Sequence, residues 1–358
     1  MNGKSIMWEY ISQEPSVLRQ LLQSEEIGKV ASVVGNEVEE VYFVAHGSSY
    51  NAAITISDFI SRVSGIRGVA YTPANFQYNT DVLQKKGNRK SLIVVISQTG
   101  TSSGAIEVLK NGKKQGYKVL GITDASESPV AKESDYTLLL GCGEEDSNAK
   151  TKGYSATLTL LLLFSLQLGL VKGRITETTK KKVLKELELQ INDLPAIVEN
   201  TCTWCEKHEF GNALTELYVL GYGMNFGTAM EGQLKLMETM CIPTMFNDIG
   251  EFSHGMHRAI TEKSSIFIIQ TEYPLKELAE ETFAYLQKVS KHVLMLDASD
   301  SSVERDGRIR IPYYPYTQSV LLTTVALQVL SVFAPEQVGK DPNRDAHNDF
   351  TEVVHTRV

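Results

Sequence analysis

Short apolar runs alternate along the chain with longer segments in which apolar positions recur at helical spacing. The run 92–96, Leu-Ile-Val-Val-Ile, contains no polar residue, which is typical of a strand covered on both faces. Strands that alternate with helical segments indicate βαβ units around a parallel sheet. The pattern therefore predicts an α/β fold, in which ligands bind beyond the carboxyl ends of the strands.

The apolar runs also recur at a nearly fixed interval, which indicates an internal repeat. A strand, a glycine-containing turn and a helical segment at 41–53 match the same succession at 217–229. Two further strands match at almost the same offset of 174 to 176 residues, namely 91–97 with 265–271 and 118–124 with 292–298. The chain is therefore predicted to hold two similar domains.

Two apolar stretches, 154–171 and 317–334, carry no charged residue over 18 positions. That length is the lower edge for a membrane-spanning helix. Both contain several Ser, Thr or Gln, and neither has a flanking cationic cluster or aromatic belts at both ends. We interpret both as helices buried in a large core. Because the N-terminal stretch also lacks an apolar signal region, we expect a cytoplasmic protein without a membrane partner.

Composition adds limits on partners. The chain has 358 residues and a formal net charge of −8, which suits two soluble domains and disfavours a broad nucleic-acid-binding surface. A site for an anion must then be local. Of four cysteines, Cys202 and Cys205 form one C-x-x-C pair, for which packing on a helix is favoured over a zinc or redox site.

The segments outside the repeat are predicted to be helical. The stretch 6–24 is expected to form helix, with Pro15 marking a helix start, and 176–199 is expected to link the domains as an amphipathic helix. The predicted parts are an N-terminal helical segment, a first domain, a linker helix, a second domain and a C-terminal tail, at 1–30, 31–174, 175–208, 209–340 and 341–358.

A hydroxyl-rich loop follows the strand at 92–96. Residues 97–104 read Ser-Gln-Thr-Gly-Thr-Ser-Ser-Gly and lead into a helical segment, an order that suits an anion held by loop amides and a helix N-terminus. A plain capping turn explains the same composition about as well. The corresponding loop of the second half, 270–274, has an acid and no glycine, so we expect it not to hold phosphate.

Three charged residues of the second half share one helix face. Glu231, Lys235 and Glu238 are spaced i, i+4 and i+7. On spacing alone a solvated Glu–Lys ladder is favoured, although an adjacent apolar stripe, formed by Met230, Leu234, Met237 and Cys241, indicates that the charged face is partly enclosed. A lone histidine, His254, lies in the loop 250–255, where a structural role is the more common one.

Several motifs resemble the SIS (sugar isomerase) family, in the arrangement found in the isomerase part of glucosamine-6-phosphate synthase. They occur in the family's order over nearly the full length, as AHGSSYNAA, SQTGTS, AKTKGYSAT, AMEGQLKLMET and GEFSHG. The resemblance implies two tandem three-layer αβα domains, each with a mostly parallel, flavodoxin-like sheet, together with a helical N-terminus and a C-terminal tail.

The resemblance also implies roles for individual residues. Glu238 matches the catalytic glutamate, with Lys235 and Glu231 in supporting positions, and His254 matches the histidine that opens the sugar ring in the active site of the other subunit of a homodimer. The implied phosphate and sugar contacts are Ser97, Gln98, Thr99 and Ser102, with Gly47, Ser48 and Ser49 alongside and Lys152 near the sugar.

These residue types suit the chemistry. Aldose–ketose interconversion moves a proton between C1 and C2, which one carboxylate can carry, and a partly buried glutamate is the better base. Ring opening needs an acid–base group such as imidazole. No metal or organic cofactor is required, and the spacing of acids offers no metal-ligand cluster.

The chain departs from the synthase pattern at three places. It enters the sugar-isomerase region directly from Met1, so we expect no release of ammonia from glutamine. Glu352 aligns, to within one residue, with a lysine that contacts the sugar. His257 and Arg258 stand where relatives often have Pro and a small residue, which changes the predicted pocket.

The favoured function is the breakdown of an amine-linked or amino hexose 6-phosphate by a deglycase or a deaminase/isomerase. The alternatives are a simple aldose–ketose isomerase and a non-catalytic sugar-phosphate sensor. The sensor is disfavoured because such proteins usually carry a helix-turn-helix domain, and because Glu238 and His254 are both present.

Overall fold

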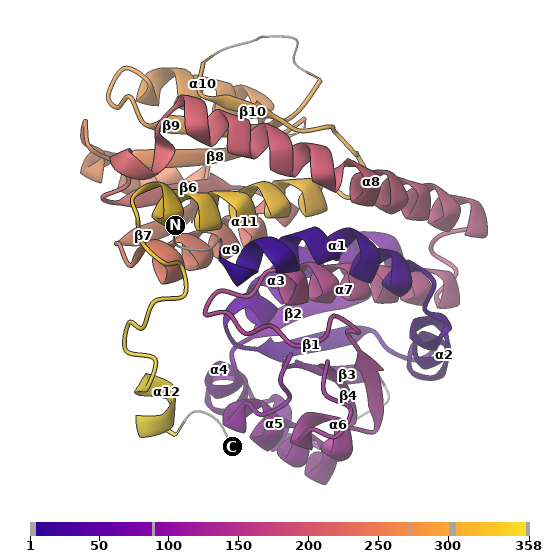
Figure 1. The fold of residues 1–358 in the computed structure, drawn as a ribbon. Coiled ribbons are helices and arrows are strands. Elements are labelled where there is room, and N and C mark those ends of the chain that lie inside the picture. The colour runs from indigo at the N-terminus through magenta and orange to yellow at the C-terminus, as the bar shows by residue number, and fades with distance from the viewer. Residues whose placement is uncertain (1–4, 88–89, 273, 301–305, 356–358) are drawn as a thin grey trace. The chain divides into compact units, whose positions relative to one another are not determined.

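The computed structural model describes residues 5–87, 90–272, 274–300 and 306–355. They divide into two compact units (Figure 1). The first unit contains residues 16–145, 152–184 and 345–358, and the second contains 1–15, 146–151 and 185–344. Two helices contribute residues to both units, namely α1 (Ile6–Leu22) and α8 (Glu177–Lys207).

The first unit is built on a five-stranded parallel sheet in the order β2-β1-β3-β4-β5. Its strands are β1 (Glu40–Ala45), β2 (Arg67–Tyr71), β3 (Ser91–Ile96), β4 (Lys118–Thr123) and β5 (Tyr136–Leu139). Every residue of β3 is buried, as expected for a central strand with helices on both faces. This strand order is that of the flavodoxin-like doubly wound fold.

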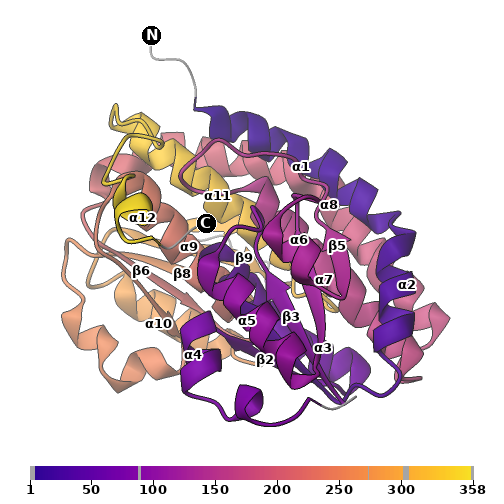
Figure 2. The ribbon, with the colours of Figure 1, turned by 90° about the horizontal axis from the view of Figure 1, so that it is seen from below.

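Helices cover both faces of the first sheet (Figures 1 and 2). One face carries α3 (Gly47–Ser64) and α7 (Lys152–Val171), which pack against each other. The other carries α5 (Ser103–Gln115), whose buried residues join Val44, Ile93 and Val95 in one apolar cluster. The remaining helices are α2 (Glu25–Val34), α4 (Pro73–Tyr78), η1 (Val82–Gln84), α6 (Pro129–Glu133) and α12 (Phe350–Val353).

The second unit repeats this topology. Its parallel sheet has the order β10-β9-β8-β6-β7, formed by β6 (Leu217–Gly221), β7 (Thr244–Asp248), β8 (Ser265–Thr271), β9 (Val293–Ala298) and β10 (Arg308–Arg310). Read from β7, the order equals that of the first sheet strand for strand. The predicted repeat and the predicted α/β class are therefore confirmed.

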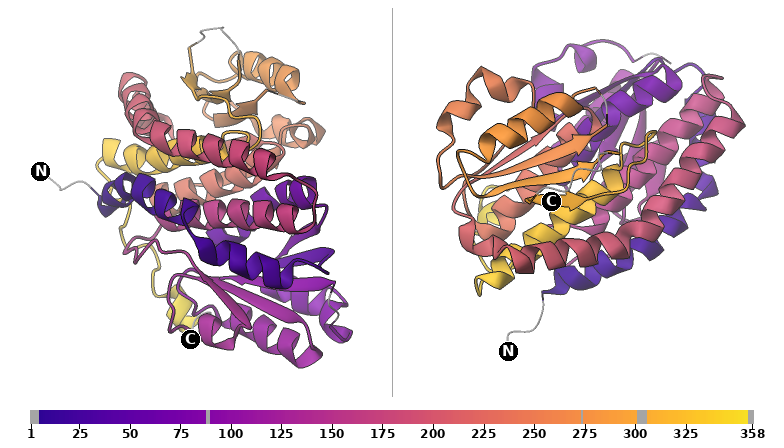
Figure 3. Two further views of the ribbon diagram at one scale, coloured as in Figure 1. Left: turned by 90° about the vertical axis from the view of Figure 1, so that its right-hand side faces the viewer. Right: turned by 90° about the horizontal axis from the view of Figure 1, so that it is seen from above.

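The helices of the second unit again lie on two faces. Figure 3 (right) shows α10 (Lys276–Leu286) on the side of the sheet opposite to α9 (Met224–Met240) and α11 (Val320–Gln337). Phe283 of α10 packs with Ile266 and Met295 in a buried cluster. The unit's short 3-10 helices are η2 (Phe210–Ala213), η3 (Glu251–His254) and η4 (Met256–Ala259).

Both long apolar stretches form core helices. α7 and α11 are long and apolar enough to cross a membrane, but 83% of the relevant window of each is buried in protein. The prediction of buried core helices is confirmed. The prediction for Pro15 is wrong, because α1 continues through this residue from Ile6 to Leu22 and does not begin there. Proline is tolerated inside a helix at the loss of one backbone hydrogen bond, so it does not by itself mark a start.

Candidate active site

The hydroxyl-rich loop lies where two helix N-termini meet at one edge of the first sheet. β1 and β3 are parallel neighbours, so α3, which follows β1, and α5, which follows β3, begin at the same edge. His46, just before α3, places its Nδ1 3.4 Å from the Oγ of Ser102, just before α5. This edge therefore concentrates backbone N–H groups and the positive ends of two helix dipoles.

The backbone of the loop depends on Gly100. Its φ is +68°, and a Cβ at this position would lie 2.1 Å from the Ser128 hydroxyl oxygen. The Gly100 N–H donates to the Ser97 carbonyl at 3.0 Å, which closes a tight turn. The hydroxyl oxygens of Thr99 and Thr101 lie 2.9 Å apart on this turn. A side chain at position 100 would displace the turn that presents these hydroxyls.

The capping alternative does not describe this loop. Ser102 occupies the N-cap position of α5, but its side chain makes no capping hydrogen bond. The first N–H groups of a helix have no partner inside the helix. The start of α5 is thus suited to an anion, as the glycines and hydroxyls of the loop predict.

A buried carboxylate connects the loop to the start of α7. Glu145 accepts hydrogen bonds from the backbone N–H groups of Lys152 and Gly153, at 3.1 and 2.9 Å, and from the Gln98 side-chain amide at 3.1 Å. The Gln98 amide nitrogen also lies 3.7 Å from the Cys142 sulfur. The side-chain nitrogen of Gln98 is thus engaged by protein groups, which leaves its backbone N–H as the donor it can offer to a ligand.

Sequence reasoning missed Glu145. It lies in a loop among other acids, and only the position of a buried helix N-terminus gives it a role. Gly153 allows the close approach, because a Cβ there would lie 2.3 Å from the Gln98 side chain. The Lys152 side chain is buried beside this cluster.

The predicted residues Gly47, Ser48 and Ser49 form the first turn of α3. Gly47 has a φ of +54°, a conformation that favours glycine, and both serines are half-buried. Burial lowers the pKa of the His46 imidazole beside them, which favours its neutral form. This histidine was not among the predicted site residues, although it directly follows a predicted strand.

The charged residues of α9 form a buried cluster. The Lys235 Nζ lies 3.4 Å from a Glu231 oxygen and 2.8 Å from a Glu238 oxygen. The exposed fractions of the side chains are 1% for Lys235, 2% for Glu231 and 32% for Glu238. Burial alone would lower the pKa of Lys235, but the two carboxylates outweigh it and hold that pKa above its ordinary value. Glu238 is the member of this cluster that solvent or a substrate can reach.

The solvated ladder favoured by spacing alone is therefore wrong, whereas the expected partial enclosure of the charged face is found. Met230 and Leu234 are half-buried, and Met237 and Cys241 are exposed, whereas Glu231 and Lys235 lie inside. Hydrophobic pattern assigns charged positions to the solvent face. Here the two buried side chains compensate each other's charge, which makes the inverted arrangement stable.

His254 ends a turn that a carboxylate holds in place. Asp248, the last residue of β7, accepts the N–H groups of Gly250 and Glu251 at 2.7 and 3.2 Å. His254 is exposed, and among the described residues no hydrogen bond or ion pair joins it to Lys235 or Glu238. His257 packs its ring against Phe252.

The corresponding edge of the second sheet carries ion pairs, one half-buried and one buried. Glu272 contacts Lys276 Nζ at 2.6 Å and accepts the Asp300 N–H at 2.9 Å. Its hydrogen bond with Lys276 lowers the pKa of this carboxyl. Asp297, fully buried, pairs with Arg308 at 2.8 Å and with Arg310. Carboxylates of the protein thus pair with the cationic side chains and with one N–H group at this edge. A phosphate would need the same groups in order to bind there.

Cys202 and Cys205 both lie in α8, as predicted, and the four cysteines are free thiols. Burial is the main cause that raises the pKa of Cys205. Among the described residues, no group of three or more His, Cys, Asp or Glu is placed to hold a metal ion. Glu352 lies in α12, but its side chain falls outside the described part of the structure.

The doubly wound fold occurs twice, with a hydroxyl-rich loop in one unit and a buried Glu–Lys cluster in the other. Together these features are typical of the class of sugar-isomerase proteins. The SIS domain model matches residues 36–166 and 214–333. The chain belongs to the SIS domain family.

Curated relatives resemble nearly the whole chain. The glutamine–fructose-6-phosphate aminotransferase (isomerizing) of Caldanaerobacter subterraneus subsp. tengcongensis is 25% identical over 353 residues, which are 94% of this chain and 57% of that protein. The chain thus spans little more than half the length of this relative.

Solved structures agree over nearly the full chain. One from Clostridium difficile 630, provisionally described as a phosphosugar isomerase, has a TM-score of 0.86 at 25% identity and covers 98% of both chains. The C-terminal domain of glucosamine-fructose-6-phosphate aminotransferase from Francisella tularensis has a TM-score of 0.84 at 24% identity, covering 96% of this chain and 99% of that one. The resemblance inferred from the motifs is confirmed.

Proposed function

We propose that the protein is an enzyme that breaks down an amine-linked or amino hexose 6-phosphate, as a deglycase or a deaminase/isomerase. The observation that carries the proposal is Glu238, whose carboxylate is partly exposed while it is held on the buried Lys235. A fixed carboxylate with one accessible side can take a proton from one carbon of a bound sugar and return it to the next.

In this proposal the first unit binds the phosphate. Ser97, Thr99 and Ser102 offer hydroxyls and the start of α5 offers N–H groups, all of which can donate to phosphate oxygens. Gly47, Ser48 and Ser49 offer the start of a second helix. Lys152 and the Gln98 backbone complete the proposed contacts, and Glu352 is proposed to meet an amine on the substrate.

The second unit supplies the proton transfers. Glu238 moves the proton between C1 and C2, while Lys235 and Glu231 fix its position. His254 opens the sugar ring, which requires an acid–base group, and an imidazole can serve as one. Once the sugar is in its open-chain form, proton transfer proceeds through a C1–C2 enediol or enamine. The amine can then leave by hydrolysis, or the carbonyl group can move between C1 and C2. These steps use protein side chains and water alone.

Turnover on a small substrate panel tests this proposal. The panel contains glucosamine 6-phosphate, fructose 6-phosphate with ammonia, and 6-phosphorylated fructosyl- and glucosyl-lysine, with Glu238→Gln as the blank. Release of hexose 6-phosphate from a lysine adduct alone identifies a deglycase, and release from glucosamine 6-phosphate identifies a deaminase/isomerase. Turnover of unmodified ketose phosphates alone would favour the simple isomerase, and tight binding without any turnover would favour a sensor.

We also propose a cytoplasmic homodimer in which His254 serves the active site of the other subunit. Its exposure, without a hydrogen bond to Glu238, supports this reading. The test mixes two inactive variants, Glu238→Gln and His254→Ala, by unfolding and refolding them together. Random pairing should restore activity to about a quarter of the sites, because each mixed dimer contains one site with both residues intact. Activity that stays at the level of the separate variants would contradict a shared site.

A further inference from the structure

A cavity of about 220 Å³ lies at the amino ends of strands in the second sheet. Ser265 and Val293, the first residues of β8 and β9, line it together with Gly307, which precedes β10. The end of α8 and the short helix η2 close the other side. None of Glu231, Lys235, Glu238 and His254 lines this cavity, so it is separate from the residues of the proposed reaction.

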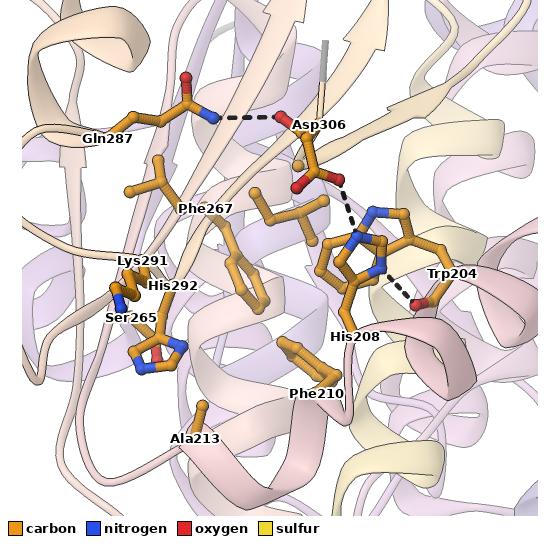
Figure 4. Close-up of a pocket in the computed structure, with 13 residues that line it drawn as sticks. Trp204, His208, Phe210, Ala213, Ser265, Phe267, Gln287, Lys291, His292 and Asp306 are labelled. Atoms are coloured by element: carbon orange, nitrogen blue, oxygen red, sulfur yellow. Dashed lines mark hydrogen bonds and ion pairs between the residues drawn. The ribbon is translucent and has the colours of Figure 1, made fainter.

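Aromatic side chains form the walls of the cavity (Figure 4). Phe210 lies with its ring centroid 5.3 Å from that of Phe267 and 5.7 Å from that of Trp204. His208 stacks on Trp204 with centroids 4.3 Å apart and planes 20° from parallel. Flat walls of this kind favour a planar ring, which can stack on them or meet them edge to face.

Protein groups already compensate the acid at one end. Asp306 Oδ1 lies 3.0 Å from His208 Nε2, and the second ring nitrogen of His208 lies 2.8 Å from the Trp204 carbonyl oxygen. The Gln287 side chain donates to the Asp306 carbonyl at 3.0 Å. The hydrogen bond from His208 lowers the pKa of Asp306, so this carboxylate is stabilised without a cationic ligand.

Two polar groups in the walls have no partner within the described residues. The Ser265 hydroxyl belongs to a side chain that is only 1% exposed, and the Trp204 indole nitrogen is also buried. An indole N–H can only donate, and a hydroxyl can donate as well as accept. A buried polar group without a partner is destabilising, so a hydrogen-bond acceptor that reaches either group would stabilise the protein.

The other end of the cavity is cationic. Lys291 and His292 are exposed and line the cavity beside Ser265 (Figure 4). Among the described residues, Asp306 is the one carboxylate that lines the cavity, and it is engaged by His208. An anionic group on the ligand therefore meets an ammonium group and an imidazole near the solvent.

Size limits the ligand further. A dry cavity of about 150 Å³ accommodates benzene in a well-studied protein, so a cavity of about 220 Å³ holds one ring with a short substituent. From the aromatic walls, the cationic end and this volume, we propose that the cavity binds a small planar aromatic acid, with its ring against Trp204 and its carboxylate toward Lys291.

Benzoate is the probe for the test. The chain has two tryptophans, so a Trp8→Phe background leaves Trp204 as the reporter of the cavity. Benzoate should change the Trp204 fluorescence in a saturable manner, with a Kd on the order of 0.1–1 mM for so small a ligand. Cyclohexanecarboxylate, which is not planar, and benzamide, which is not charged, should each bind at least about fivefold more weakly. Saturation-transfer NMR on the unmodified protein gives a second measurement that needs no variant.

Two variants test the contacts, and two more serve as controls. Ser265→Ala and Lys291→Met should each weaken benzoate binding, by roughly 5- to 10-fold. Lys288→Met is the matched control, since Lys288 is an exposed lysine of the same segment that does not line the cavity, and it should leave binding unchanged. Glu238→Gln should also bind benzoate normally, so that the result is independent of the proposed catalytic role. No saturable binding by either measurement, or equal losses in the two lysine variants, would overturn the proposal.

Discussion

The two units share one topology but use the carboxyl edge of their sheets in opposite ways. In the first unit this edge ends in hydroxyls, a glycine of positive φ and two helix N-termini, with no carboxylate of the loop itself. In the second, Glu272 and Asp297 lie at the equivalent edge and are paired with Lys276, Arg308 and Arg310. Of the two copies of the fold, only the first therefore has the edge that we propose to bind an anion.

In the second unit, the residues proposed to act in the reaction lie near the end of α9. Lys235 and Glu238 lie in the last turns of this helix, far along the chain from the strand that precedes it. Equivalent strands therefore do not imply equivalent sites, because the proposed chemistry of the second unit depends on charges inside the helix layer and not on the loop after a strand. Four substitutions test this contrast between the two units.

The largest effect is expected for Glu238→Gln. The amide keeps the shape of the side chain but cannot accept a proton, so turnover on the substrate identified in the panel should fall by about 1000-fold or more. Sugar-phosphate binding, measured by calorimetry, should remain. Glu281→Gln, at an exposed position of α10, serves as the matched control. Undiminished turnover in Glu238→Gln would remove the proposed reaction from the second unit.

Lys235→Met should destabilise the second unit. The substitution keeps much of the volume but leaves the buried Glu231 without its ammonium partner, which costs about 3–5 kcal/mol of unfolding free energy. Urea denaturation measures this loss. Lys185→Met breaks an exposed pair with Glu188 and should cost less than about 1 kcal/mol. Similar losses in both variants would mean that the α9 cluster behaves as surface charge.

The double variant Ser97→Ala with Thr99→Ala tests the loop of the first unit. Binding of hexose 6-phosphate should weaken roughly 10- to 100-fold, because two hydroxyl donors to an anion are lost. The unphosphorylated hexose should bind as it does to the unaltered protein, by the same calorimetric assay. An equal loss for both ligands would show that the hydroxyls contact the sugar and not the phosphate.

Thr271→Ala is the counterpart in the second unit and should have the smallest effect. Thr271 follows the repeat offset from Ser97, but its hydroxyl donates to the Tyr222 hydroxyl at 3.0 Å. Losing that bond should cost about 1 kcal/mol of stability, while phosphate affinity stays unchanged. A loss of hexose 6-phosphate binding here would erase the difference between the two edges.

The sequence was informative where burial produces long apolar runs. The central strands β1, β3, β4, β6, β8 and β9 were all predicted, because helices cover both of their faces. The edge strands β2, β5, β7 and β10 were not, since β2, β5 and β7 are only partly buried and β10 has three residues, so none of them produces such a run. The domain bounds predicted from the sequence stay a prediction.

Charged groups inside the fold account for most of what was missed. Hydropathy assigns Glu145, Asp297 and Lys235 to the surface, but each is buried because specific partners compensate its charge. Such pairs join residues that local patterns do not connect, as with Asp297 and Arg308. The roles of the predicted site residues came from motif order, and they stay predictions until the variants are measured.

The packing of α7 and α11 bears on how the chain is made. Each helix is apolar enough to engage the machinery that inserts proteins into membranes if it emerged from the ribosome uncovered. However, α7 packs on α2 and α3, and α11 packs on α9, all of which are synthesised earlier. The packing partners of each apolar helix have therefore already been synthesised when that helix leaves the ribosome. Since domains fold as units during synthesis, this order of elements favours early burial of both apolar segments.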